Sequence, residues 1–81
     1  MSRHQLLVTK SSDYRIENDI CVAVRAHDIC AWSTDHPAVG QRLIGAIGTS
    51  GGYALSPTPQ VGMRLVFAND LMTSTVVAVV G

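Results

Sequence analysis

MRLVFANDLMTSTVVAVV, residues 63–80, carries the clearest fold signal in this chain. Met63, Leu65 and Phe67 alternate with the residues between them, which is the pattern of a strand with two different faces. Asn69-Asp70 then supplies a tight turn, and TSTVVAVV at 73–80 supplies a second run of β-forming residues. The stretch therefore predicts a β-hairpin.

The second strand of this hairpin is apolar on both faces from Val76 to Val80. A strand of this kind is expected to be covered on both sides, because an open apolar strand promotes aggregation. A chain of 81 residues can provide such cover by closing into a small barrel, by packing a helix on one side, or by using a neighbouring subunit.

The composition favours a neighbouring subunit as part of that cover. Charged residues are 15% of the chain and hydrophobic residues 47%, whereas about 25% charged residues is usual. A small protein has much surface to keep hydrated, so this shortage of charge predicts self-association, as a homo-oligomer, or a protein partner.

The charge balance and the N-terminus limit the other partners. Six basic and six acidic residues cancel, and no basic run is present, so we expect no nucleic-acid binding. The N-terminus lacks the apolar core of a signal peptide, and no stretch reaches the ~18 apolar residues of a membrane span. We expect a cytoplasmic protein with no membrane contact, and reduced cysteines.

Alternation in residues 14–24 suggests a further hairpin. Tyr14, Ile16 and Ile20 share one face with Val22 and Val24 if Glu17-Asn18-Asp19 is a three-residue loop, whereas a two-residue loop would place Ile16 and Ile20 on opposite faces. We predict the three-residue loop.

A next turn centred on Ala26-His27 would place Cys21 opposite Trp32 and Ala23 opposite Cys30. The two cysteines are then diagonal neighbours about 7 to 8 Å apart, too far for an unstrained disulfide. We predict that this second apolar face, together with two valines of the last strand, forms an interface composed of Cys21, Ala23, Cys30, Trp32, Val77 and Val79.

The segment 36–45 has two readings. Apolar residues recur at helical spacing after Pro37, which favours a short helix, but Gly40 and Gly45 each weaken a helix by about 1 kcal/mol. A strand through 42–47 is the alternative. With the helix, residues 1–81 are predicted to form one compact, mainly β domain, a small partly closed barrel or sandwich of five to six antiparallel strands with one short helix.

The segment Gly48–Gly52 (GTSGG) fits the G-x-S-x-G pattern of a nucleophilic serine. It also resembles the Gly-Asp-Ser-Gly-Gly of chymotrypsin-like proteases. The resemblance covers five residues, differs at Thr49, and implies a fold more than twice this length, so we interpret the segment as a glycine-rich loop. Whether this loop binds a ligand is left open.

No constellation for catalysis or metal binding stands out. Cys21 and Cys30 are nine residues apart with His27 between them, and no second closely spaced ligand pair exists, so we expect no metal and no cofactor. The leading hypothesis is a non-enzymatic assembly or protein-binding module that self-associates through apolar sheet surface. The alternatives are a small-ligand-binding or regulatory domain, which would use the glycine loop and the hydroxyls of Thr73–Thr75, or a small inhibitor of a larger host or viral complex.

Overall fold

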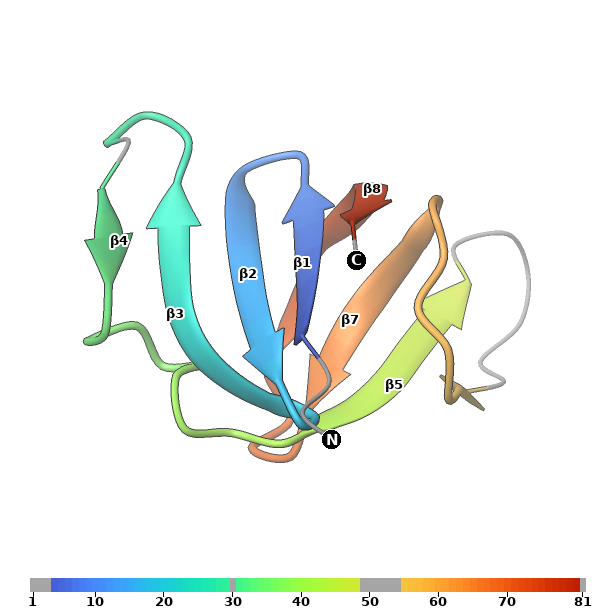
Figure 1. Ribbon diagram of the computed structural model, residues 1–81. Helices are drawn as coiled ribbons and strands as arrows, with labels where there is room; N and C mark the ends of the chain where they lie inside the picture. The colour runs from blue at the N-terminus through green and yellow to red at the C-terminus, as the bar shows by residue number, and fades with distance from the viewer. Residues whose placement is uncertain (1–3, 30, 49–54, 81) are drawn as a thin grey trace.

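The computed structural model describes residues 4–29, 31–48 and 55–80, which form eight strands (Figure 1). In chain order these are β1 (His4–Thr9), β2 (Ser12–Glu17), β3 (Ile20–Ala26), β4 (Trp32–Ser33), β5 (Leu43–Gly48), β6 (Leu55–Ser56), β7 (Met63–Phe67) and β8 (Met72–Val80). They build one antiparallel sheet in the order β4-β3-β2-β1-β8-β7-β5-β6. The prediction of a mainly β fold is confirmed, whereas the prediction of five to six strands is wrong.

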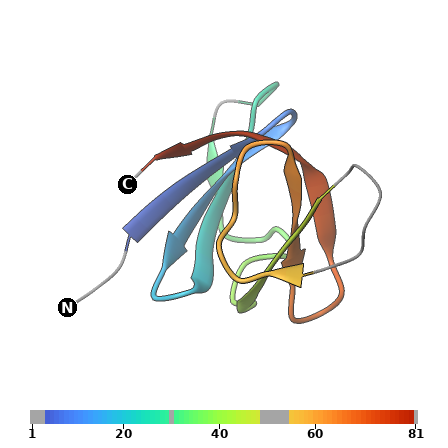
Figure 2. The same cartoon turned by 90° about the vertical axis from the view of Figure 1, so that its right-hand side faces the viewer.

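The sheet is strongly curled but is not a closed barrel. Figures 1 and 2 show β1, β2 and β3 on one side and β5 and β7 on the other, with the long strand β8 bending between the two halves. At one end an antiparallel bridge between Ile20 and Arg42 joins the start of β3 to the residue before β5. The two short strands β4 and β6 stand at the ends of the strand order.

Curling encloses an apolar core on the concave face. Phe67, Leu7 and Ile16 are its largest fully buried side chains, at most 1% exposed, and the ring of Tyr14 packs 5.8 Å from that of Phe67. The other buried apolar residues of this cluster are Cys21, Val24, Ala38, Leu43, Ala46, Leu65 and Val76. Strands from both halves contribute, so burial of this face holds the curl together.

The predicted hairpin at 63–80 is present as β7 and β8. Phe67 donates its backbone N–H to the carbonyl of Leu71, and Asp70 between them has a φ of 65°. Asp and Asn tolerate this left-handed conformation better than most residues, which explains why Asn69-Asp70 makes the turn.

The predicted three-residue loop after β2 is wrong. Asn18 and Asp19 have φ values of 52° and 68°, the conformation of a two-residue type I′ turn, and Glu17 pairs directly with Ile20. A β-bulge then leaves Val22 as an extra residue between the pairs formed by Ile16 and by Arg15. The shorter turn places Ile20 and Cys21 on the faces of the sheet opposite to those predicted, and the bulge returns the residues from Ala23 onward to their predicted faces.

These two features move Cys21 into the core and Ile20 to the surface. Cys21 pairs with Ile16 and is 0% exposed, while Ile20 is 36% exposed. The predicted turn centred on Ala26-His27 is also wrong, because Trp32 pairs with Arg25 rather than with Cys21. The connection between β3 and β4 is therefore longer than predicted, and Cys30 within it lies outside the described residues.

The predicted helix at 36–45 is also wrong, and the alternative strand is present as β5. Gly40 has a φ of 85° and donates its N–H to the carbonyl of Cys21 at 2.7 Å, while Cys21 donates to the carbonyl of Gln41 at 3.0 Å. These bonds to β3 take the place of helical hydrogen bonds, and a left-handed glycine ends any helix. The described residues contain no helix.

None of the described segments is a helix with the length and apolar character needed to cross a membrane.

Candidate functional site

Two arginines stack on the tryptophan of β4. The guanidinium carbons of Arg15 and Arg25 each lie 4.6 Å from the centre of the Trp32 ring. Arg25 is the cross-strand partner of Trp32, and Arg15 lies between two core residues of β2, so its side chain points away from the core. Each cation–π contact is worth about 0.5–1 kcal/mol at an exposed site, and together they fix an indole that is 36% exposed.

A buried carboxylate, that of Asp13, neutralises Arg25. Asp13, 5% exposed, accepts hydrogen bonds from Arg25 Nε at 3.0 Å and Nη2 at 2.6 Å, and its other oxygen lies 2.8 Å from His27 Nε2. Burial alone would raise the pKa of Asp13, but the hydrogen bonds from His27 and Arg25 outweigh it and the pKa is lowered from 3.8. Asp13 is therefore ionised at neutral pH and anchors both side chains.

Arg15 has no such partner. The nearby carboxylate of Glu17 pairs with His4 at 3.0 Å, and among residues 4–29, 31–48 and 55–80 the side chain of Arg15 makes neither a salt bridge nor a hydrogen bond. Its guanidinium is thus held by stacking, and no described residue accepts a hydrogen bond from its N–H groups.

Apolar side chains of β1 and β8 continue the same face. Leu6 pairs with Val80 and Val8 with Ala78, while Leu7 between them points into the core. Val77 is the extra residue of a β-bulge opposite Val8 and is 47% exposed. We call this face the outer surface; its residues are Leu6, Val8, Arg15, Trp32, Val77 and Val80.

The structure separates the residues that were predicted to form one interface. Trp32 and Val77 lie on the outer surface, and Ala23 lies on the same face but is 8% exposed. Cys21 is buried in the core, and Val79 pairs with the core residue Leu7, so it lies on the opposite face of β8. The sixth residue, Cys30, falls outside the described residues.

The described part of the chain does not cover the apolar strand β8 on both faces. Val76 is 0% exposed, but Val77, Val79 and Val80 are 47%, 41% and 52% exposed. This end of β8 pairs with β1, whereas the pairs of β8 with β7 run from Met72 to Thr75. Among the described strands, the three valines therefore lie on a segment that pairs on one side. The described residues therefore leave part of the apolar surface of β8 open to solvent.

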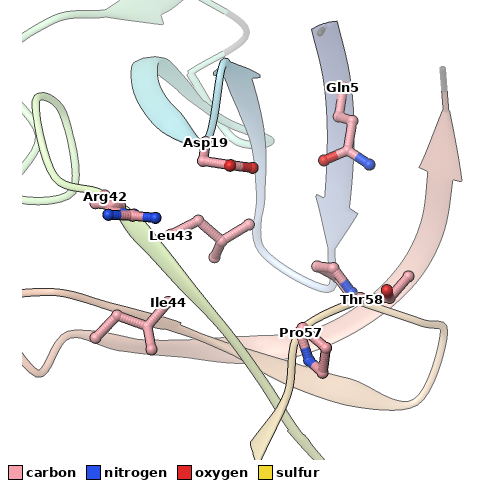
Figure 3. Close-up of a pocket in the computed structure, with 8 residues that line it drawn as sticks. Gln5, Asp19, Arg42, Leu43, Ile44, Pro57 and Thr58 are labelled. Atoms are coloured by element: carbon pink, nitrogen blue, oxygen red, sulfur yellow. The ribbon is translucent and has the colours of Figure 1, made fainter.

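A separate groove of about 560 Å³ lies at the open side of the curled sheet (Figure 3). It is lined by residues of the β2–β3 turn, the start of β1, the start of β5 and the loop after β6, namely Gln5, Asp19, Arg42, Leu43, Ile44, Pro57, Thr58 and Pro59. Arg42 and Asp19 bring one positive and one negative charge to it. Its volume is in the range of about 300–1,000 Å³ that small-molecule sites occupy.

Thr73 is one of the residues whose hydroxyls were expected to line a ligand pocket, and in the structure its hydroxyl has a structural role. Its side chain is 4% exposed, and its Oγ1 accepts the backbone N–H of Leu65 at 3.1 Å and donates to the carbonyl of Ser74 at 2.8 Å. The bond to Leu65 supplies a partner where a bulge interrupts the β7–β8 pairing. Most of the glycine loop, including Ser50, lies outside the described residues.

Reactive groups are scarce in the described part of the chain. Burial raises the pKa of the Cys21 thiol to about 11, and its S–H donates weakly to the carbonyl of Ala23 at 3.7 Å. A thiol in this state is protonated at neutral pH and is a poor nucleophile. His36 accepts the N–H of Ala38 at 3.0 Å through Nδ1. Over residues 4–29, 31–48 and 55–80, no three His, Cys, Asp or Glu side chains gather in a way that could hold a metal ion.

Comparisons with protein families, curated proteins and solved structures give no match to this chain. The outer surface therefore has to be interpreted from its own geometry. Trp32 and Val77 were among the residues predicted from the sequence, whereas Arg15 and Arg25, which stack on Trp32, were not. The available signal was that each arginine stands next to core residues in an alternating strand, but pairing them with Trp32 required the correct register.

Proposed function

We propose that this protein is a non-enzymatic assembly module that self-associates through the outer surface. The observation that carries the proposal is the exposure of Val77 and Val80, at 47% and 52%, on the end of β8 that pairs with β1 and extends past its pairs with β7. Leu6 and Val8 extend this apolar area onto β1. A partner surface would remove it from water at a gain of about 25 cal/mol for each Å² of apolar area.

The polar groups beside the apolar area suit an interface. Asp13 neutralises Arg25, and Glu17 pairs with His4, so two potential charges need no partner from another molecule. Trp32 is held by stacking in a fixed position, and interfaces favour large rigid aromatic side chains and arginine near their centre. Little side-chain freedom would therefore be lost on association.

Sedimentation equilibrium at micromolar concentration tests this proposal. We expect the wild-type chain to sediment as a dimer or larger species, and the variant carrying Val77→Glu and Val80→Glu to sediment as a monomer. Val61→Glu is the matched control, because Val61 is 64% exposed but lies in the loop before β7 and is not one of the residues of the outer surface. A monomeric wild type would overturn the proposal, and so would a double variant that stays assembled.

The groove supports a second candidate function, the binding of a small polar molecule. Arg42 and Asp19 could recognise a ligand that carries both an anionic and a cationic group, and Gln5 and Thr58 add neutral hydrogen-bonding groups. Isothermal titration with a free zwitterionic amino acid mixture is the first test. Binding heat that is lost in Arg42→Ala and retained in Lys10→Ala would support this function, and no heat with the wild type would count against it.

A further inference from the structure

The tip of the β3–β4 connection, Asp28-Ile29, exposes a carboxylate beside a large apolar side chain. Ile29 is 69% exposed, the highest value among the large hydrophobic residues that the structure describes. Asp28 next to it is exposed and forms no salt bridge with any other described residue. A small protein gains nothing for its own stability from displaying such a pair.

Backbone and side-chain contacts hold this tip in place. His27 donates its N–H to the carbonyl of Ser11 at 3.0 Å, and Ile29 donates to the carbonyl of Ala26 at 3.2 Å. The His27 ring is fixed by the buried carboxylate of Asp13 at 2.8 Å. The Asp28-Ile29 pair is thus displayed on an anchored turn, which lowers the entropy cost of binding.

The outer surface offers the complementary groups. A hollow of about 270 Å³ is lined by Leu6, Val80, Trp32 and Arg15, together with His4 and Gln5. Its apolar wall suits an aliphatic side chain, and Arg15 at its rim has N–H donors that no described residue uses. An arginine binds a carboxylate through two parallel hydrogen bonds, and stacking on Trp32 already orients the guanidinium plane.

We propose that the occupant of this hollow is the Asp28-Ile29 tip of a second copy of the same chain. Ile29 of one protomer packs against Leu6, Val80 and the Trp32 ring of its partner, and Asp28 pairs with Arg15. Each copy displays an anion at Asp28 and a cation at Arg15 that form no ion pair with another described residue, so two copies related by a twofold axis make the contact twice. This inference rests on the proposed self-association and assigns the residues that specify it.

Charge exchange between the two positions is the direct test. Arg15→Glu and Asp28→Arg are each expected to weaken the dimer about tenfold or more, because like charges then face each other across the interface. The double variant Arg15→Glu with Asp28→Arg recreates an ion pair in reversed order and is expected to recover most of the affinity. Sedimentation equilibrium over a concentration series gives the dissociation constants.

A variant with three substitutions separates the specific pair from net charge. Arg15→Glu with Gln60→Lys and Ala68→Lys has the same net charge as the exchanged pair, but Gln60 and Ala68 are exposed in the loops on either side of β7 and do not recreate the contact. We expect it to remain as weak as Arg15→Glu alone. Far-ultraviolet circular dichroism on every variant shows whether the fold is retained, and the recovery in the exchanged pair cannot come from an unfolded chain.

The outcomes also distinguish this inference from the proposed function. A monomeric wild type overturns both. A dimeric wild type that the single charge reversals do not weaken overturns the tip contact alone, and the same holds if the exchanged pair fails to recover. Capture of a stoichiometric foreign protein by a monomeric wild type would show that the outer surface serves another partner and would overturn the second copy as occupant.

Discussion

Replacing Asp13 with Asn removes the buried carboxylate that holds the side chains of Arg25 and His27 in place. Asp13 accepts three hydrogen bonds from Arg25 and His27 at 2.6–3.0 Å, and a hydrogen bond to a charged group is worth about 1.5–3 kcal/mol. The Arg25 and His27 side chains are 37% and 42% exposed, so in the variant water can replace part of what they lose. We therefore expect Asp13→Asn to lower the free energy of unfolding by about 2 kcal/mol rather than by the full sum.

The loss should depend on pH in a defined direction. Because the folded-state pKa of Asp13 is lowered from 3.8, its contribution is fully present above that value and disappears as the pH falls through the lower folded-state pKa. The difference in stability between wild type and Asp13→Asn should therefore be constant near neutral pH and shrink below about pH 4.

Urea unfolding followed by the fluorescence of Trp32, the sole tryptophan, measures this difference. All samples need the same protein concentration, since self-association adds to apparent stability. Asp70→Asn is the matched control, because Asp70 is exposed and Asn tolerates its φ of 65° equally well. A loss in Asp13→Asn no larger than in this control, or a loss that persists unchanged at pH 2, would refute the assigned role of Asp13.

Two further substitutions test the strand geometry. A Cβ at Gly45 would lie 2.3 Å from the backbone oxygen of Ser56, so Gly45→Ala should lower the free energy of unfolding by about 1–3 kcal/mol by displacing β6. Gly48→Ala is the control, because open space surrounds that position and no loss is expected. Equal thermal midpoints for the two variants would contradict the packing of β5 on β6. Thr73→Val leaves the buried N–H of Leu65 without its acceptor and should lower the free energy of unfolding in urea by about 1–3 kcal/mol. Thr73→Ser keeps the hydroxyl and should lose clearly less stability. Similar losses in both variants would argue against this bond.

Local signals predicted the parts of the fold that depend on neighbouring residues. The β7–β8 hairpin was predictable because alternation in 63–67 and the turn at Asn69-Asp70 agree with each other. The length of the β2–β3 turn was not, since both Asn18 and Asp19 tolerate a positive φ and the alternation pattern alone favoured the longer loop. The bulge at Val22 that reconciles the shorter turn with the buried pattern leaves no local trace.

Long-range contacts explain the remaining differences. The segment after Pro37 has helical spacing, but backbone bonds between Gly40 and Cys21 decide in favour of a turn and a strand. The stack of Arg15 and Arg25 on Trp32 joins three strands, so an error of one residue in register hides it. The candidate site was therefore visible from the sequence as an excess of apolar residues on β8, without its charged component.

Sedimentation equilibrium of the wild type beside the variant with Val77→Glu and Val80→Glu tests the central claim most directly, namely that the outer surface mediates self-association. The account predicts an assembled wild type, a monomeric double variant and an assembled Val61→Glu control. A wild type that remains monomeric throughout the micromolar range would contradict it.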